Sequence, residues 1–135
     1  MPPTVLPPEQ RAVVLIDLAN DFLYPGGVIA DAGGPDYQRR AQAILPAVRR
    51  LIDGARAAGV LVVYATDAHT PGDDELRKWP PHAMKGTPQA EIPAAIAPQP
   101  GDLVLEKRTY SPFLSTGLDA ELTARGIRQL YVAGL

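Results

Sequence analysis

The sequence predicts an α/β fold: a three-layer α/β/α sandwich around a mostly parallel sheet. Apolar runs at 11–17 and 60–67 are too dense for a half-exposed strand, and they are typical of parallel strands covered on both faces. Residues 35–59 show helical periodicity between them, and weaker strand-like runs follow at 102–107 and 128–135. Such alternation builds parallel sheets with right-handed crossovers, and ligands bind at the C-terminal ends of the strands.

Composition indicates one ordinary domain that binds a small molecule. The chain has 135 residues, of which 46% are hydrophobic, and its net charge is -2. Its Lys and Arg residues are not clustered, which argues against nucleic acid and against a membrane surface as partners.

The N-terminal segment "MPPTVLPPEQ" has no basic start and no apolar run, so we expect a Pro-rich arm over 1–10 and not a signal peptide. The domain then occupies 11–135, and the protein is expected to be cytoplasmic. The chain contains no cysteine, which excludes disulfides and any thiol nucleophile within these residues.

The segment 35–59 predicts a helix with Gly59 at its C-terminal cap. Pro46 either kinks this helix or marks its true first turn. Its arginines should mostly face solvent. The expected inward positions are Ala41, Ile44 or Leu45, Val48, Leu51 or Ile52, and Ala55.

Two further segments complete the chain. The stretch "GLDAELTARG" predicts a short helix with Leu118 and Leu122 inward and Gly126 as its stop. The connection 68–101 is much longer than the usual 4 to 6 residues or so, which makes it a functional candidate. Within it, "EIPAAIAPQP" predicts a short helix followed by a turn.

Polar residues follow three of the predicted strands: Asp17, then Asp67 with His69, then Lys107. Taken singly, Asp17 could cap a turn and Lys107 could be a solvated strand end. Because parallel strands deliver their C-terminal ends to one edge of the sheet, their joint placement favours a site.

The stretch "TDAHTPGDDELRKWPPH" holds both histidines of the chain together with several carboxylates. Imidazole and carboxylate ligands suit zinc or another first-row divalent ion, and Asp67 and His69 can share one ion. The gap between His69 and His82 matches no compact helical motif, so two surface histidines in a polar loop remain an alternative from spacing alone.

Several motifs agree in order and spacing with one family. The segments "VVLIDLANDF", "DAH", "WPPHAMKGTPQAEI" and "EKRTYSPFLSTGLDAELTARGIRQLYVAGL" together resemble the isochorismatase-like cysteine hydrolases, which have a Rossmann-like sheet. Within that family the chain looks most like the nicotinamidase branch. The resemblance runs from about Arg11 to Leu135.

The resemblance implies roles for individual residues. It makes Asp17 the general base that later returns its proton, and Lys107 the residue that holds Asp17 charged and helps to lower the thiol pKa. It implies aromatic walls for the substrate, although ordinary core packing remains open for each ring. These walls are Phe22, Trp79 and Tyr110.

The resemblance also implies a divalent ion, expected to be zinc. Its ligands would be Asp67, His69, His82 and a fourth residue, which is Glu75 or, in a shifted alignment, Asp74. The neighbouring Asp73 is expected to face solvent.

The nucleophilic cysteine of that family lies about five residues past "LYVAGL", at a helix N-terminus that would stabilise a thiolate. We therefore expect these 135 residues to be the N-terminal portion of the domain, with its C-terminal part absent. Such a portion should leave a sheet edge and apolar surface uncovered and be prone to aggregation. The expected association is a homo-oligomer or one with the missing C-terminal piece.

The sequence-based hypothesis is the N-terminal portion of a metal-dependent cysteine amidohydrolase, resembling nicotinamidase, which converts nicotinamide to nicotinate and ammonia. One alternative is another isochorismatase-like hydrolase, of the N-carbamoyl amidase or isochorismate hydrolase type. A second alternative is a non-catalytic fragment that binds a metal or a small molecule.

Overall fold

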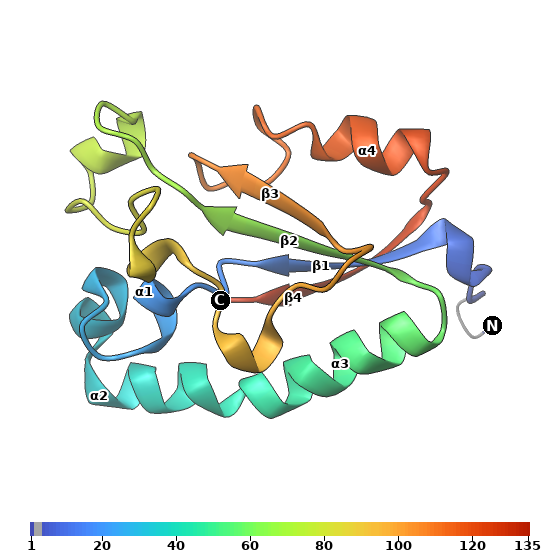
Figure 1. The fold of residues 1–135 in the computed structure, drawn as a ribbon, viewed down its shortest axis with the longest axis horizontal. Coiled ribbons are helices and arrows are strands. Elements are labelled where there is room, and N and C mark those ends of the chain that lie inside the picture. Colours follow the sequence, from blue (N-terminus) through green and yellow to red (C-terminus); the bar gives the residue numbers. More distant parts are fainter. Residues whose placement is uncertain (2–3) are drawn as a thin grey trace.

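The predicted α/β sandwich is confirmed by the computed structural model, which describes residue 1 and residues 4–135 (Figure 1). One parallel sheet has the strand order β3-β2-β1-β4. Its strands are β1 (Arg11–Ile16), β2 (Leu61–Asp67), β3 (Leu103–Lys107) and β4 (Gln129–Gly134). All four end at the same edge of the sheet, where much of the 68–101 connection gathers (Figure 1).

The N-terminal arm makes hydrogen bonds with the rest of the chain. Residues 2 and 3 of it lie outside the described residues, but Pro8–Gln10 form a short 3-10 helix, η1. The backbone N–H of Leu6 donates to Oε1 of Gln129, and the N–H of Arg128 donates to the carbonyl of Gln10. The arm therefore contacts the chain where β4 begins.

The single helix expected over 35–59 is in fact parts of two helices. Helix α2 (Val28–Ala43) begins earlier, and α3 (Leu45–Ala57) follows it after Ile44. Pro46 lies in the first turn of α3, where its missing N–H costs nothing, as one of the two alternatives predicted.

Two short helical segments in this part of the chain were not predicted. One is α1 (Asn20–Leu23), and the other is the first part of α2, which is separated from the second part by Gly34 with φ 78° and ψ 178°. Neither segment is long enough to show helical periodicity in the sequence.

Each face of the sheet has its own apolar core, because side chains alternate between the faces of a strand. On one face, β1 and β2 pack against α3, whose inward residues prove to be Leu45 and Ile52 of the two alternative pairs. On the other face lies α4 (Leu118–Ala124), with Leu118 and Leu122 buried as predicted. Arg56 is an exception to the exposed arginines of α3, since it pairs with Asp102.

The long connection is irregular apart from three short 3-10 helices: η2 (Asp74–Arg77), η3 (Pro88–Ala90) and η4 (Ala94–Ile96). The last is the short helix predicted in "EIPAAIAPQP". Across the part of the chain that the structure describes, no helix is both long enough and apolar enough to cross a bilayer.

The C-terminus of α3 yields a stability prediction. Gly59 has φ +72°, its N–H donates to the carbonyl of Arg56, and the N–H of Val60 donates to that of Ala55, which is a Schellman motif. A Cβ at Gly59 would meet nothing within 4 Å, so only backbone strain opposes a side chain there. We expect Gly59→Ala to lower the free energy of unfolding by about 1 kcal/mol.

Gly59→Asn is the matched control, because asparagine tolerates the left-handed region better than alanine. Denaturant titration of both variants would measure the difference. Equal losses would contradict the strain argument.

Candidate active site

The site begins with the register of two neighbouring strands. Asp67 and Lys107 are paired residues at the ends of β2 and β3, so their side chains meet at the edge of the sheet. The buried Lys107 ammonium lies 2.5 Å from Oδ1 of Asp67 and 2.9 Å from Oδ1 of Asp17, and it donates to the carbonyl of Thr109 at 3.0 Å. The three residues predicted from strand ends are thus brought together, with the carboxylates of Asp17 and Asp67 both in contact with the Lys107 ammonium.

Asp17 lies directly after β1 in a strained conformation, with φ 58°. Its N–H still continues the ladder by donating to the carbonyl of Ala65. Burial and the nearby charge of Asp67 raise the pKa of Asp17 to about 6, although Lys107 acts in the opposite direction. Lys107 favours the ionised carboxylate of Asp17, but its effect on this pKa is smaller than the combined effect of burial and the charge of Asp67.

The Lys107–Asp67 pair stays charged. Burial alone would raise the pKa of Asp67, but the neighbouring His82 and Lys107 side chains outweigh it and hold that pKa below its ordinary value. Burial likewise opposes the charge of Lys107, but the carboxylates of Asp17 and Asp67 raise its pKa.

A small bridge brings the two histidines together, although they are far apart in the sequence. The N–H of His69 donates to the carbonyl of Ala83, and the N–H of Lys85 donates to the carbonyl of His69. The buried imidazoles of His69 and His82 then lie with ring centroids 4.7 Å apart.

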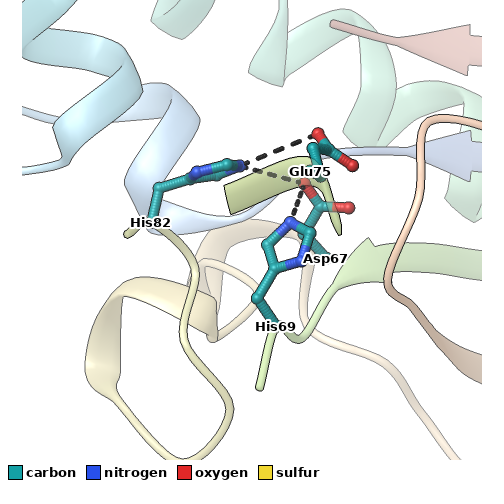
Figure 2. Close-up of side chains that lie close together, drawn as sticks. All are labelled: Asp67, His69, Glu75 and His82. Atoms are coloured by element: carbon teal, nitrogen blue, oxygen red, sulfur yellow. Dashed lines mark ion pairs between the residues drawn. The ribbon is translucent and has the colours of Figure 1, made fainter. Parts of the chain in front are cut away.

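Both histidines turn Nε2 toward the carboxylate of Asp67 (Figure 2). Nε2 of His69 is 3.3 Å and Nε2 of His82 is 3.6 Å from Oδ2 of Asp67. Nε2 of His82 is also 4.0 Å from Oε1 of Glu75. One ligand atom from each of the four residues lies within 4.8 Å of the others.

These residues fit a divalent ion. Separations of about 3–4 Å are expected between ligand atoms around tetrahedral zinc, whose bonds to N and O are about 2 Å long. Nε2 of His69 and Oε2 of Glu75 are buried without a hydrogen-bond partner among the described residues. Such atoms are costly to bury unless something satisfies them, and an ion would do so.

The two candidates for the fourth ligand lie in different places. The side chain of Glu75 is 7% exposed and faces His82, whereas that of Asp74 is 88% exposed and contacts Arg77. Adjacent residues of η2 point in different directions, so only Glu75 joins the group.

The expectation that Asp73 faces solvent is wrong. Its carboxylate is buried, and Oδ2 accepts hydrogen bonds from Nδ1 of His69 and from the N–H of Thr70, both at 3.0 Å. Its other oxygen accepts a hydrogen bond from Nε of Arg108 at 2.8 Å. The hydrogen bonds from Arg108 hold the pKa of Asp73 well below its usual range.

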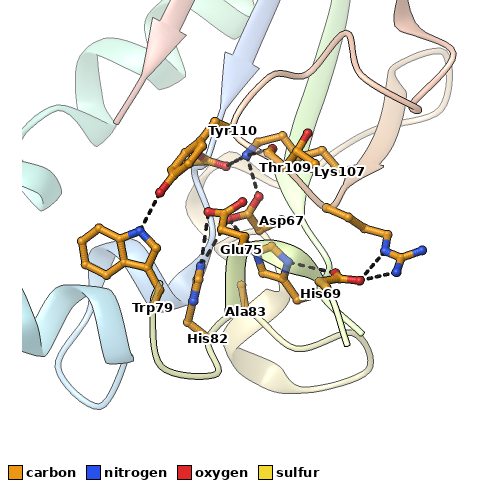
Figure 3. A network of polar contacts seen from close by, with 12 residues as sticks. Asp67, His69, Glu75, Trp79, His82, Ala83, Lys107, Thr109 and Tyr110 are labelled. Carbon is orange, nitrogen blue, oxygen red and sulfur yellow. Dashed lines mark hydrogen bonds and ion pairs between the residues drawn. The ribbon is translucent and has the colours of Figure 1, made fainter. Parts of the chain in front are cut away.

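The three predicted aromatic residues lie around the group at different depths. Phe22 packs edge-on against the His82 ring, with centroids 6.1 Å apart. Trp79 and Tyr110 are 42% and 62% exposed, and Nε1 of Trp79 donates to the Tyr110 hydroxyl at 2.7 Å (Figure 3). Trp79 and Tyr110 are therefore not core residues.

Sequence reasoning assigned no role to Asp21, which is buried nearby. Its Oδ1 accepts from the N–H of Ile29 and its Oδ2 from the N–H of Ala83, both at 2.9 Å. Asp21 thus ties the start of α2 to the residue after His82. The only signal in the sequence was its place in the motif "NDF".

Comparison with known proteins gives consistent matches over nearly the whole chain. The isochorismatase domain model matches residues 11–135. The ureidoacrylate amidohydrolase RutB of Agrobacterium fabrum is 34% identical, over 98% of this chain and 67% of the relative. The chain spans only 62% and 64% of two further curated relatives with the same activity in their names.

Solved structures of amidases are similar to this chain over most of its length. N-carbamoylsarcosine amidase from Thermoplasma acidophilum is 37% identical with a TM-score of 0.83, over 93% of this chain and 67% of that chain. The pyrazinamidase of Pyrococcus horikoshii, solved in complex with zinc, is 26% identical with a TM-score of 0.78, over 93% of this chain and 70% of that chain.

The environment of Asp17 predicts a stability gain on neutralising it. Because its pKa is raised from 3.8 to about 6 in the folded state, the ionised carboxylate opposes folding above pH 6 and the penalty disappears as pH falls toward 4. We expect Asp17→Asn to raise the free energy of unfolding of the metal-free protein by about 1–3 kcal/mol at neutral pH.

Urea titrations at several pH values would check this. The gain should shrink as pH is lowered from 6 to 4, where the wild-type carboxyl is also neutral. A difference in the free energy of unfolding between Asp17→Asn and the wild type that does not depend on pH would contradict the prediction.

The geometry of the four ligands predicts one zinc ion per chain and a clear difference between neighbouring carboxylates. Glu75→Gln should weaken zinc binding by about tenfold or more, because it removes a charged ligand. Asp74→Asn is the matched control and should leave binding unchanged, since that side chain is exposed. Competition with a chromophoric chelator would measure both, and equal affinities in the two variants would exclude Glu75 as a ligand.

Proposed function

The chain belongs to the isochorismatase family, and we propose that it carries the metal-binding and acid–base residues of a cysteine hydrolase that cleaves the carbon–nitrogen bond of a small-molecule amide. One observation carries the proposal. Asp67 contacts Lys107 through Oδ1 and lies beside both histidines through Oδ2, so the expected catalytic pair and the expected metal ligands form one site.

The metal would be held by the four-residue group described above: Asp67, His69, Glu75 and His82. A divalent ion in this position supplies a Lewis acid that orients and polarises the substrate. The zinc-bound pyrazinamidase among the structural neighbours supports zinc as the ion.

Asp17 would move the proton. A carboxyl group with a pKa of about 6 can accept a proton near neutral pH and return it to a leaving amine. Lys107 contacts it at 2.9 Å, so the ammonium would stabilise the carboxylate and nearby negative charge. The raised pKa is what suits Asp17 to both steps.

The family resemblance assigns the nucleophile to a cysteine beyond residue 135. The position of the end of β4 supports this assignment. Gly134 pairs with Ile16, and the N–H of Leu135 donates to the carbonyl of Ile16, one residue before Asp17. A segment that continues from β4 therefore starts beside the proposed base, which would take the proton from the thiol.

We propose an aromatic carboxamide of the nicotinamide type as the substrate. The group of four possible metal ligands supports this choice, because a structural neighbour solved in complex with zinc is a pyrazinamidase. Trp79 and Tyr110 would supply apolar faces for a flat ring at the rim of the site, and Phe22 would line it beside His82.

A second candidate substrate is an N-carbamoyl compound. The relatives named ureidoacrylate amidohydrolase and N-carbamoylsarcosine amidase are the observation that favours it. Hydrolysis of such a ureido group gives an amine and carbamic acid, which breaks down to carbon dioxide and ammonia, whereas a carboxamide gives ammonia and a carboxylate.

An assay of the zinc-loaded intact protein tests the function. We expect ammonia from nicotinamide; carbon dioxide together with ammonia from an N-carbamoyl amino acid would favour the second candidate. Lys107→Met should lower turnover by about 100-fold or more, because it removes the charge beside Asp17. Lys85→Met is the matched control, since Lys85 is exposed and pairs with Glu106, and it should retain activity.

Ammonia from neither substrate would exclude both candidates. Equal activity in the two lysine variants would remove Lys107 from the mechanism.

A further inference from the structure

The His69 imidazole is contacted on its outer side by a carboxylate that is not one of the proposed metal ligands. Nδ1 of His69 lies 3.0 Å from Oδ2 of Asp73, while Nε2 faces Oδ2 of Asp67 at 3.3 Å. Both side chains are almost completely buried, at 0% and 2% exposed. The two ring nitrogens therefore face two different environments.

Asp73 is itself fixed from several directions. Its oxygens accept from the backbone N–H and the hydroxyl of Thr70, each at 3.0 Å, and from Nε of Arg108 at 2.8 Å. Arg108 directly follows Lys107, the proposed catalytic lysine, at the end of β3. A carboxylate held in this way can only accept hydrogen bonds.

We propose that Asp73 is a positioning residue that fixes His69 as the Nδ1–H tautomer and so presents the Nε2 lone pair to the metal. Nδ1 forms a hydrogen bond with the Asp73 carboxylate at 3.0 Å, which requires the proton to be on that nitrogen. Nε2 lies 3.3 Å from Asp67 and has no hydrogen-bond partner among the described residues, so its lone pair is free to bind. Arg108 and Thr70 keep the carboxylate in place. The inference rests on the proposed metal site and adds how one of its ligands is oriented.

His82 provides an internal comparison. Its Nδ1 lies 2.8 Å from the carbonyl oxygen of Pro80, which can only accept, so the same tautomer is fixed there by the backbone. At His69 the equivalent acceptor is the side chain of Asp73, so it can be removed by mutation. Partners of this kind orient metal-binding histidines and raise their basicity.

A purely structural role for Asp73 would predict something different. Its contacts with Thr70 hold the turn that precedes η2, and loss of that turn would lower the stability of the whole loop. It would not shift the proton between the nitrogens of His69. The tautomer is therefore the measurement that separates the two roles.

The first experiment reads the tautomer in the metal-free intact protein, by two-dimensional NMR of ¹⁵N-labelled imidazoles at alkaline pH. We expect His69 to carry its proton on Nδ1 in the wild type and in Asp74→Asn, and to show a mixture of tautomers in Asp73→Asn. Asparagine can turn its NH₂ group toward His69, which removes the obligatory acceptor. The Nε2–H form of His69 in the wild type would overturn the proposal without any variant.

The second experiment measures zinc affinity in the same three proteins by chelator competition. Asp73→Asn should weaken binding by about 10- to 100-fold, and Asp74→Asn should not change it. Unchanged affinity and an unchanged tautomer in Asp73→Asn would overturn the positioning role.

The two readouts distinguish this inference from the function it rests on. If the wild type binds no zinc, the metal-dependent function fails, while the NMR result still tests whether Asp73 sets the tautomer. If zinc binds normally and His69 is unaffected by Asp73→Asn, the positioning role fails and the proposed function stands.

Discussion

The shared use of Asp67 is the constraint on which the rest of the site depends. Strand pairing places this residue beside Lys107, and burial requires each charge to have a partner. One oxygen serves the lysine and the other faces the two histidines. Because both oxygens belong to one planar carboxylate, a shift of the proposed catalytic Lys107 would also be felt by the two histidines of the proposed metal site.

This arrangement explains why the site contains so much buried charge. Burial and the nearby charge of Asp67 raise the pKa of Asp17 by more than its contact with Lys107, which also pairs with Asp67, lowers it. Asp73 is the opposite case, because Arg108 compensates it fully and its pKa falls. The pKa values of two aspartates within one site are thus shifted in opposite directions, upward by burial at Asp17 and downward by the hydrogen bonds from Arg108 at Asp73. Such sites are tuned for chemistry at some cost in stability.

Much of the fold could be predicted from the sequence, because its signals are local. Dense apolar runs gave the strands, and glycines with positive φ end α3 and α4 where expected, at Gly59 and Gly126. The meeting of Asp17 with Lys107 followed from a general rule, since parallel strands end at one edge. The sequence could not decide which residue of each alternative pair on α3 is buried, because that depends on how the helix packs against the sheet.

The orientation of the acidic run in "GDDEL" could not be predicted in the same way. Asp73, Asp74 and Glu75 are consecutive carboxylates in an irregular loop, where no periodicity indicates which side chain points inward. The structure gives each a different environment: an arginine clamp, solvent and the metal group. The protonation of Asp17 was equally invisible, because it depends on a sum of burial and several charges.

The two-sided contacts of Asp67 also bear on how relatives of this protein diverge. If the proposed ion is bound, a lineage that stopped using it would be released from keeping Glu75 and His82, yet it would still need a carboxylate next to the buried Lys107. Retention of an aspartate at this position therefore says little about metal use in a homologue. The informative positions are Glu75 and His82, whose side chains lie in the metal group but do not contact the lysine, and their joint loss would mark an evolutionary branch that works without zinc.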